Sequence, residues 1–174
     1  MISRLYLKNK SKTYSIKSMN EANALNSVAE FHHTFKHPIE PNPLIPAVER
    51  CKLRVALLAE ELKELEEAIK DQNIIEVADA LCDLQYVLSG AILEFGLGNK
   101  FGELFAEVHR SNMSKACISP QEAAQTIEYY KKKDGTESYF IESDGKFLIY
   151  RKEDNKTLKS IHYEPARLEA IVKK

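Results

Sequence analysis

Two hydrophobic helical patterns follow each other along residues 58–88, separated by a short polar break near residues 70–73. In each pattern, aliphatic side chains recur every three or four residues, which predicts a helix with one apolar face. Two such helices joined by so short a loop should pack antiparallel. The apolar faces that would meet are Leu58, Leu62, Leu65 and Ile69 on the first helix and Val77, Leu81, Leu84 and Leu88 on the second.

Carboxylates lie beside both apolar stripes. The three glutamates of the first helix span an arc of roughly 100°, and the acids of the second helix follow i, i+3, i+7 spacing. Facing carboxylates repel one another, and desolvation makes the repulsion worse. A hard divalent cation such as Mg²⁺ resolves the conflict, because it takes oxygen ligands and often shares its shell with substrate phosphates. We therefore expect a metal site drawn from Glu60, Glu61, Glu64, Glu76, Asp79 and Asp83.

The alternative to a metal site is an ordinary solvated acidic surface, and its strength differs between the two helices. On its own, the first would be an ordinary solvated acidic face, since Glu66 and Lys70 already form a typical i, i+4 surface pair. The second is mostly apolar from Ile74 to Phe95, and buried acids without partners are rare.

Arg54 precedes the acids on the first helix. It is a surface cation, or it contacts a substrate phosphate, a ligand that arginine suits well, or it orders the carboxylates.

Three stretches carry a resemblance: EELKE at Glu60–Glu64, ADALCDLQYVLSG in the second helix, and EVHRSNMSK at Glu107–Lys115. Over roughly residues 28–115 the chain resembles the MazG-like, all-α NTP pyrophosphohydrolase superfamily, in its phosphoribosyl-ATP pyrophosphohydrolase-like branch. That family carries Glu-x-x-Glu on one helix and Glu/Asp-x-x-Asp on the next. Glu61 and Glu64 match the first part. The second part departs from the pattern, because Ala80 stands where many relatives have a glutamate.

The resemblance implies a site and an assembly. Asp79 with Asp83 is one replacement for the second half of the motif, and Glu76 with Asp79 is the other. The implied Mg²⁺ ligands are Glu61, Glu64, Asp79 and Asp83, with Mn²⁺ as a possible substitute, and Glu60 or Glu61 would accept the proton of the attacking water. The implied substrate contacts are His109, Arg110, Asn112 and Lys115. Relatives assemble as homodimers or homotetramers, so a homo-oligomer is implied as well.

The expected function is metal-dependent hydrolysis of a nucleoside triphosphate, with a (d)NTP giving pyrophosphate and a nucleoside monophosphate. Phosphoribosyl-ATP is the alternative substrate. A di-iron or di-manganese oxidoreductase would need Glu-x-x-His pairs on two helices, and the acidic stretch has none. A non-catalytic helical module that binds a nucleotide stays open, because a fold can outlive its function.

Composition and charge exclude some classes of binding partner. A formal net charge of −1 over 174 residues gives no basic surface for nucleic acid. The apolar run at residues 74–98 is interrupted by acids, so it predicts a core helix and no membrane partner. The three cysteines show no paired metal spacing, and the N-terminus lacks an apolar signal core. These features favour a reducing cytoplasm.

The expected fold is mainly α, an antiparallel bundle of four to five helices with a small C-terminal β-hairpin. Residues 1–19 form an N-terminal extension, residues 20–132 a helical catalytic domain, and residues 133–174 a hairpin and tail packed on it. Asp144-Gly145 between two β-prone runs predicts the hairpin turn. Capping boxes are expected at Ser18–Glu21 and Ser119–Glu122, and Gly90 predicts a closely packed neighbouring helix.

Overall fold

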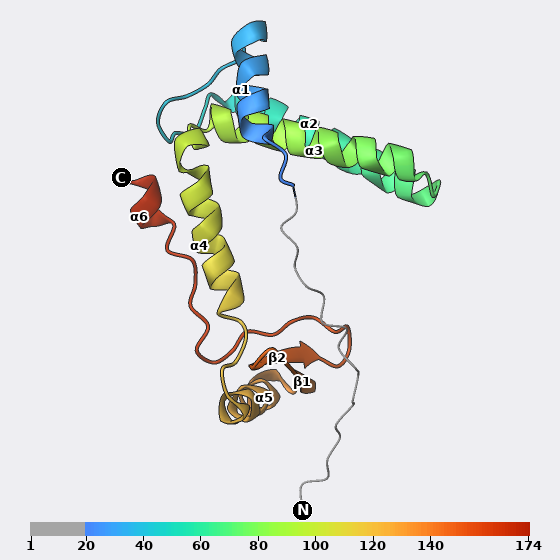
Figure 1. Cartoon of the computed structure of the whole chain (residues 1–174), viewed down its shortest axis with the longest axis vertical. Coiled ribbons are helices and arrows are strands. Elements are labelled where there is room, and N and C mark those ends of the chain that lie inside the picture. The colour runs from blue at the N-terminus through green and yellow to red at the C-terminus, as the bar shows by residue number, and fades with distance from the viewer. Residues whose placement is uncertain (1–19) are drawn as a thin grey trace, which may run out of the picture. The chain divides into compact units, whose positions relative to one another are not determined.

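A computed structural model describes residues 20–174 of the chain, and Figure 1 shows that they are mainly helical. The expected helical fold with a small antiparallel hairpin is confirmed. The expected N-terminal extension and Ser18 lie outside the described residues. The capping box predicted at Ser18–Glu21 is nevertheless wrong as the start of this helix, because Glu21 is described and not helical, and the helix begins at Ala24 after Asn23. The elements in chain order are α1 (Ala24–Phe35), α2 (Val48–Lys70), α3 (Ile74–Glu94), the 3₁₀ turn η1 (Gly98–Lys100), α4 (Phe101–Met113), α5 (Pro120–Asp134), β1 (Ser138–Ser143), β2 (Lys146–Arg151) and α6 (Glu169–Val172).

The described chain divides into two compact units. We call residues 21–107 with 167–174 the helical unit, and residues 108–166 the mixed unit. The division falls within α4, ahead of the boundary expected at residue 133. The mixed unit therefore includes the C-terminal part of α4, the whole of α5 and the hairpin.

In the helical unit, α2 and α3 lie side by side along their lengths and α1 packs against α3 (Figure 1). The break between α2 and α3 is a tight turn in which Gln72 has φ 53°. Asn73 begins α3 as its N-cap, since its side chain accepts hydrogen bonds from the N–H groups of Ile75 and Glu76. The predicted antiparallel pair is present. The predicted packed faces are only partly correct, because Leu62 and Ile69 of α2 and Leu81 and Leu88 of α3 are exposed.

The proline-rich segment before α2 docks on the C-terminal end of α3. The N–H of Glu40 donates to the carbonyl of Leu93 at 3.0 Å, and that of Leu44 donates to Phe95 at 3.2 Å. Gly96 ends the helix in the left-handed region, with φ +67°, as the sequence predicts. A Cβ at Gly96 would lie only 1.8 Å from the Asn42 carbonyl oxygen, so this close approach requires glycine.

The mixed unit has its own small core, in which α5 packs against the hairpin. Ser119 caps α5 by accepting from the Glu122 N–H at 3.1 Å, and the Glu122 side chain in turn accepts from the Ile118 N–H. Asp144 and Gly145 form the hairpin turn with φ of 50° and 73°, which confirms that prediction. The core side chains are Cys117, Ala123, Phe147, Ile149 and Leu158.

Among residues 20–174, no single helix is both long enough and apolar enough to cross a membrane, although one bent pair of helices meets those limits when taken together.

Replacement of Gly96 by alanine tests the docking of the proline-rich segment. The new Cβ would collide with the Asn42 carbonyl and strain the left-handed backbone, so we expect the free energy of unfolding to fall by about 3 kcal/mol. Gly102→Ala is the matched control, because nothing lies within 4 Å of a Cβ at that position. Equal urea midpoints for the two variants would contradict the expectation.

Candidate active site

The predicted carboxylates occupy the middle of the α2–α3 pair. Glu61 is half-buried on α2, and Glu60 and Glu64 beside it are exposed. Asp79 and Asp83 are exposed on α3. Because the helices run antiparallel from a tight turn at residues 71–73, their spacing should bring Glu64 near the level of Asp79 and Glu61 near the level of Asp83. Glu76 is exposed in the first turn of α3, nearer the interhelical turn.

The electrostatics of Glu61 reveal how these acids act on one another. Partial burial raises the pKa of Glu61, and the negative charges of four neighbours raise it further. Those neighbours are Glu64, Asp83, Glu60 and Asp79, in decreasing order of effect. Acids from both helices therefore act on the same carboxyl group, as the helical spacing predicted. Like charges held this close favour a bound cation or a shared proton.

The donor set fits a hard cation, since carboxylate oxygens are the ligands that Mg²⁺ and Mn²⁺ prefer. In the part of the chain that the structure describes, no three acidic, histidine or cysteine side chains converge closely enough to form a ready-made cage. Most of the acids are exposed, so their side chains are free to turn toward an ion. Glu61, Glu64, Asp79 and Asp83 remain the predicted ligands.

Arg54 is not a surface cation, which was one of its expected roles. Its side chain is buried, with 7% of its surface exposed, and its guanidinium pairs with the carboxylate of Glu94. Arg50 binds the same carboxylate, with its Nε 3.1 Å from Glu94 Oε2. Burial of Glu94 tends to raise its pKa, but hydrogen bonds from the two arginines outweigh this and hold the pKa below its ordinary value. The Arg54 guanidinium thus has a buried partner of its own, and a contact with substrate stays a prediction.

The same network includes α1 and explains Gly90. His32 is buried, its Nδ1 lies 2.8 Å from the Pro38 carbonyl, and its Nε2 lies 3.3 Å from an Arg54 nitrogen. A Cβ at Gly90 would lie 2.6 Å from Arg54 Nη1 and 3.0 Å from His32 Nε2. The neighbouring helices that Gly90 predicts are therefore α1 and α2 of the same chain. Sequence analysis missed Glu94, although an acid at the end of so apolar a helix was a usable signal.

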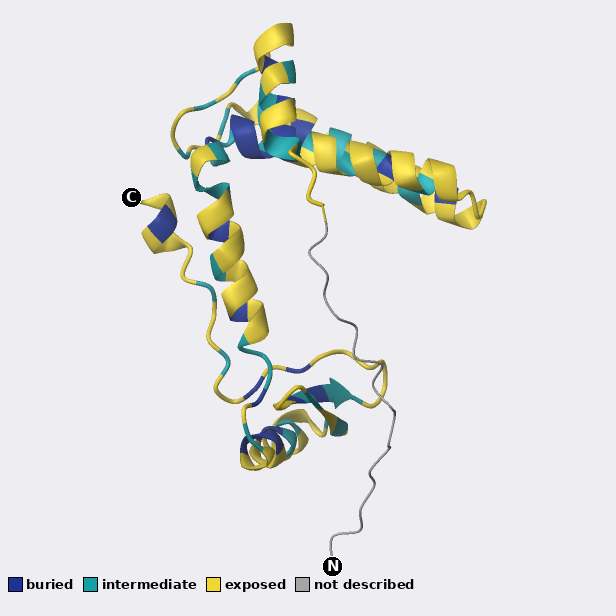
Figure 2. Cartoon of the chain, viewed as in Figure 1, coloured by how far each residue is buried: buried dark blue, intermediate teal, exposed yellow. Residues whose placement is uncertain are grey.

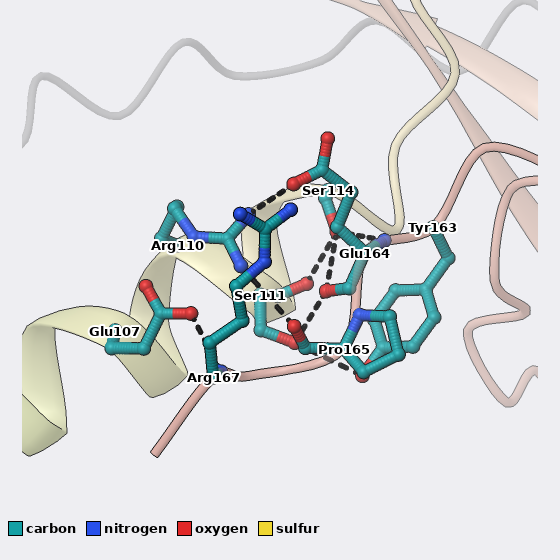
Figure 3. A network of polar contacts seen from close by, with 8 residues as sticks. All are labelled: Glu107, Arg110, Ser111, Ser114, Tyr163, Glu164, Pro165 and Arg167. Atoms are coloured by element: carbon teal, nitrogen blue, oxygen red, sulfur yellow. Dashed lines mark hydrogen bonds and ion pairs between the residues drawn. The ribbon is translucent and has the colours of Figure 1, made fainter. Parts of the chain in front are cut away.

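The other predicted substrate contacts belong to the mixed unit, whereas the carboxylates belong to the helical unit. His109 and Asn112 are exposed on α4. Arg110 pairs with Glu164 at 2.8 Å and donates to the Pro165 carbonyl, so it fastens the C-terminal tail to α4 (Figure 3). The ammonium of Lys115 donates to the Asn112 side chain at 2.7 Å. Their substrate roles stay predictions.

Comparison with known proteins identifies one family. Residues 28–112 match the model of the phosphoribosyl-ATP pyrophosphohydrolase family. A relative is the uncharacterized protein L479 of Acanthamoeba polyphaga mimivirus, which is 25% identical over 233 aligned residues. The alignment covers 79% of this chain and 91% of the viral protein. The family match includes every carboxylate of the α2–α3 pair discussed above.

Repulsion among the acids predicts a pH-dependent effect on stability. Because the folded protein raises the pKa of Glu61 above its ordinary value of 4.5, ionisation of Glu61 destabilises the fold as pH rises through and above that value. In EDTA at neutral pH, Glu61→Gln should therefore raise the melting temperature by up to about 2 °C, and the difference should vanish in acid. Glu66→Gln is the control, since Glu66 is paired with Lys70. Melting curves in which both variants behave alike at every pH would contradict the expectation.

Proposed function

We propose that this protein is a metal-dependent nucleotide pyrophosphohydrolase, because residues 28–112 match the model of the phosphoribosyl-ATP pyrophosphohydrolase family. Its substrate is a nucleoside triphosphate, and its products are pyrophosphate and a nucleoside monophosphate. The observation that carries the proposal is the set of carboxylates from α2 and α3 whose negative charges together raise the pKa of Glu61. Such a set suits the binding of a divalent cation together with a phosphate-bearing substrate.

The protein's own groups have defined tasks in this reaction. Glu61, Glu64, Asp79 and Asp83 would hold Mg²⁺ or Mn²⁺. When bound, the ion supplies positive charge to the phosphate oxygens and makes water more acidic. Glu60 or Glu61 accepts a proton from the attacking water, whose oxygen bonds to phosphorus while the bond to the pyrophosphate leaving group breaks.

The choice of substrate has two candidates. We favour a canonical or modified (d)NTP, because the proline-rich segment before α2 and the β-hairpin of the mixed unit are additions to a compact helical core. The family description favours phosphoribosyl-ATP as the second candidate. Both substrates present a phosphoanhydride to the same carboxylates, so the chemistry proposed for Glu60 and Glu61 is unchanged.

The proposal predicts pyrophosphate release that needs both the metal and the carboxylates. In a panel of NTPs, dNTPs and phosphoribosyl-ATP, one or a few substrates should give pyrophosphate with Mg²⁺ or Mn²⁺ and none with EDTA. Glu61→Gln and Asp83→Asn should each lower kcat/KM at least about 100-fold and abolish the rise in melting temperature on adding Mg²⁺. Glu66→Gln, on the same helix but paired with Lys70, should do neither.

Unchanged activity and unchanged Mg²⁺ stabilisation in both carboxylate variants would overturn the proposed site. Tight nucleotide binding without turnover by the native protein would instead indicate a non-catalytic nucleotide-binding module.

The protein partner in this proposal is a second copy of the chain. Figure 2 shows that α2 and α3 are largely exposed along much of their length. Each helix exposes three aliphatic side chains spaced seven residues apart, which we call the seam: Val55, Leu62 and Ile69 on α2, and Ile74, Leu81 and Leu88 on α3. Their exposed fractions range from 41% to 76%. Counted from the turn between the antiparallel helices, Ile69 should stand near the level of Ile74, Leu62 near Leu81, and Val55 near Leu88.

A heptad repeat is the pattern by which helices pack against other helices over several turns. A water-exposed aliphatic stripe of this length on both helices of a pair is unfavourable for an isolated monomer. A second α2–α3 pair presents the same repeat, so two copies would bury both seams in a four-helix arrangement. This supports a homodimer, or a homotetramer built from dimers.

Substitutions in the seam should dissociate the oligomer. Burial of each leucine contributes about 1.5–3 kcal/mol, so Leu62→Gln with Leu81→Gln should weaken association at least about 100-fold. Light scattering after size-exclusion chromatography should find a dimer or tetramer for the native chain and a monomer for this double variant. Phe105→Gln is the control, because Phe105 is equally exposed on α4 outside the seam. A native protein that stays monomeric at high concentration would refute the predicted oligomer.

A further inference from the structure

Two lysines that are far apart in the sequence lie on adjacent segments of the mixed unit. Lys115 follows the end of α4, and Lys159 lies in the segment after β2. The Ser160 N–H donates to the Lys115 carbonyl at 3.1 Å, and the Lys159 N–H donates to the Tyr130 hydroxyl at 3.2 Å. These bonds hold the two lysines on adjacent segments of chain, so their proximity is a consequence of the fold.

Tyr163 brings the Lys159 side chain to a defined position. The Lys159 ammonium lies 4.1 Å from the centroid of the Tyr163 ring, a favourable cation–π distance. The tyrosine is itself anchored, since its N–H donates to the Ser160 carbonyl at 3.0 Å and its hydroxyl lies 3.0 Å from Ser111 Oγ. Figure 3 shows Ser111 and Tyr163 joined in this polar network at the end of α4.

In the described part of the chain, no carboxylate neutralises the positive charges of Lys115 and Lys159. Lys115 is half-buried, and its ammonium donates to the uncharged Asn112 amide. Within residues 20–174, neither Lys115 nor Lys159 has a carboxylate at ion-pair distance. Glu164 lies nearby, but its carboxylate pairs with Arg110 at 2.8 Å. Two lysines on adjacent segments, each without a carboxylate partner, favour an anionic ligand.

The ionisation of Tyr163 supports this arrangement. Its hydrogen bond with Ser111 lowers the pKa of the phenol, and the charges of Lys159 and Lys115 lower that pKa further. Both ammonium groups therefore act on the same phenol oxygen, from segments that are far apart in the sequence.

We propose that Lys115 and Lys159, with Tyr163 positioning Lys159, form a binding site for a phosphate group. Ammonium groups donate several charge-assisted hydrogen bonds, which phosphate oxygens accept well. The phosphate comes from the nucleotide or from free pyrophosphate. Its assignment to the nucleotide rests on the proposed function, whereas the binding of a phosphate group does not.

Binding of inorganic pyrophosphate to the full-length protein in EDTA tests the site by calorimetry. Lys115→Gln and Lys159→Gln should each raise the Kd for pyrophosphate about fivefold. Lys146→Gln removes an exposed lysine of the hairpin turn in the same unit and should leave the Kd unchanged. Binding that is absent at millimolar pyrophosphate, or weakened equally by all three substitutions, would overturn the proposal.

Two variants test the positioning role of Tyr163. Tyr163→Phe keeps the ring under Lys159 and should bind pyrophosphate within about twofold of the native affinity, whereas Tyr163→Leu should bind as weakly as Lys159→Gln. Pyrophosphate should also raise the pKa of Tyr163 in a tyrosinate absorbance titration that uses Tyr163→Phe as the reference, because the bound anion offsets both lysines. A Tyr163→Leu variant with native affinity, or an unmoved phenol pKa, would contradict this role.

Competition and turnover separate the possible outcomes. If a nucleoside triphosphate displaces pyrophosphate and loses affinity on Lys159→Gln, the phosphate belongs to the nucleotide. If the triphosphate does not compete, the ligand is free pyrophosphate. Normal metal-dependent turnover with no lysine-dependent pyrophosphate binding would refute this site and leave the proposed function standing. Lysine-dependent pyrophosphate binding in a protein that hydrolyses no nucleotide would support this phosphate site and refute the proposed function.

Discussion

The buried carboxylate of Glu94 is the contact on which the helical unit depends. Arg50 and Arg54 reach it from α2, and His32 of α1 lies against Arg54. Removal of one partner from a buried ion pair costs several kcal/mol, because the remaining charge has nothing to neutralise it. Buried polar pairs of this kind can also select one alignment of packed helices over others. In this chain the aligned pair is α2 and α3, and their register determines which acids stand level with one another.

That register gives the α2–α3 pair two surfaces of opposite character. One carries carboxylates whose repulsion raises the pKa of Glu61, and the other is the exposed aliphatic seam. Each surface is unfavourable in an isolated, metal-free chain, the first through like charges and the second through apolar contact with water. A cation would relieve the first and a second copy the second. In the function proposed above, metal binding and self-association would therefore both stabilise the same pair of helices.

The mixed unit is stabilised by a small apolar core and by hydrogen bonds to its C-terminal segment. Its core is small and is closed by α5 and the two-stranded hairpin. Ser160 and Glu122 form a buried hydrogen bond that ties the C-terminal segment to α5. Ser111 and Ser114 bind the main chain of the same segment near Glu164 (Figure 3). These contacts place the segment that carries Lys159 next to the segment that carries Lys115.

Local pattern alone determined much of this protein. Apolar periodicity predicted α2 and α3, Asp144-Gly145 predicted the hairpin, Ser119 predicted the cap of α5 and Gly96 predicted the end of α3, because each feature depends on residues a few positions apart. The same spacing brought Glu61, Glu64, Asp79 and Asp83 to one part of the helix pair. Tertiary structure alone decided which distant groups meet. Arg54 pairs with Glu94, and the segment of Lys115 adjoins the segment that carries Lys159 and Tyr163, because charged side chains are long and the partner available to each is selected by packing between remote segments.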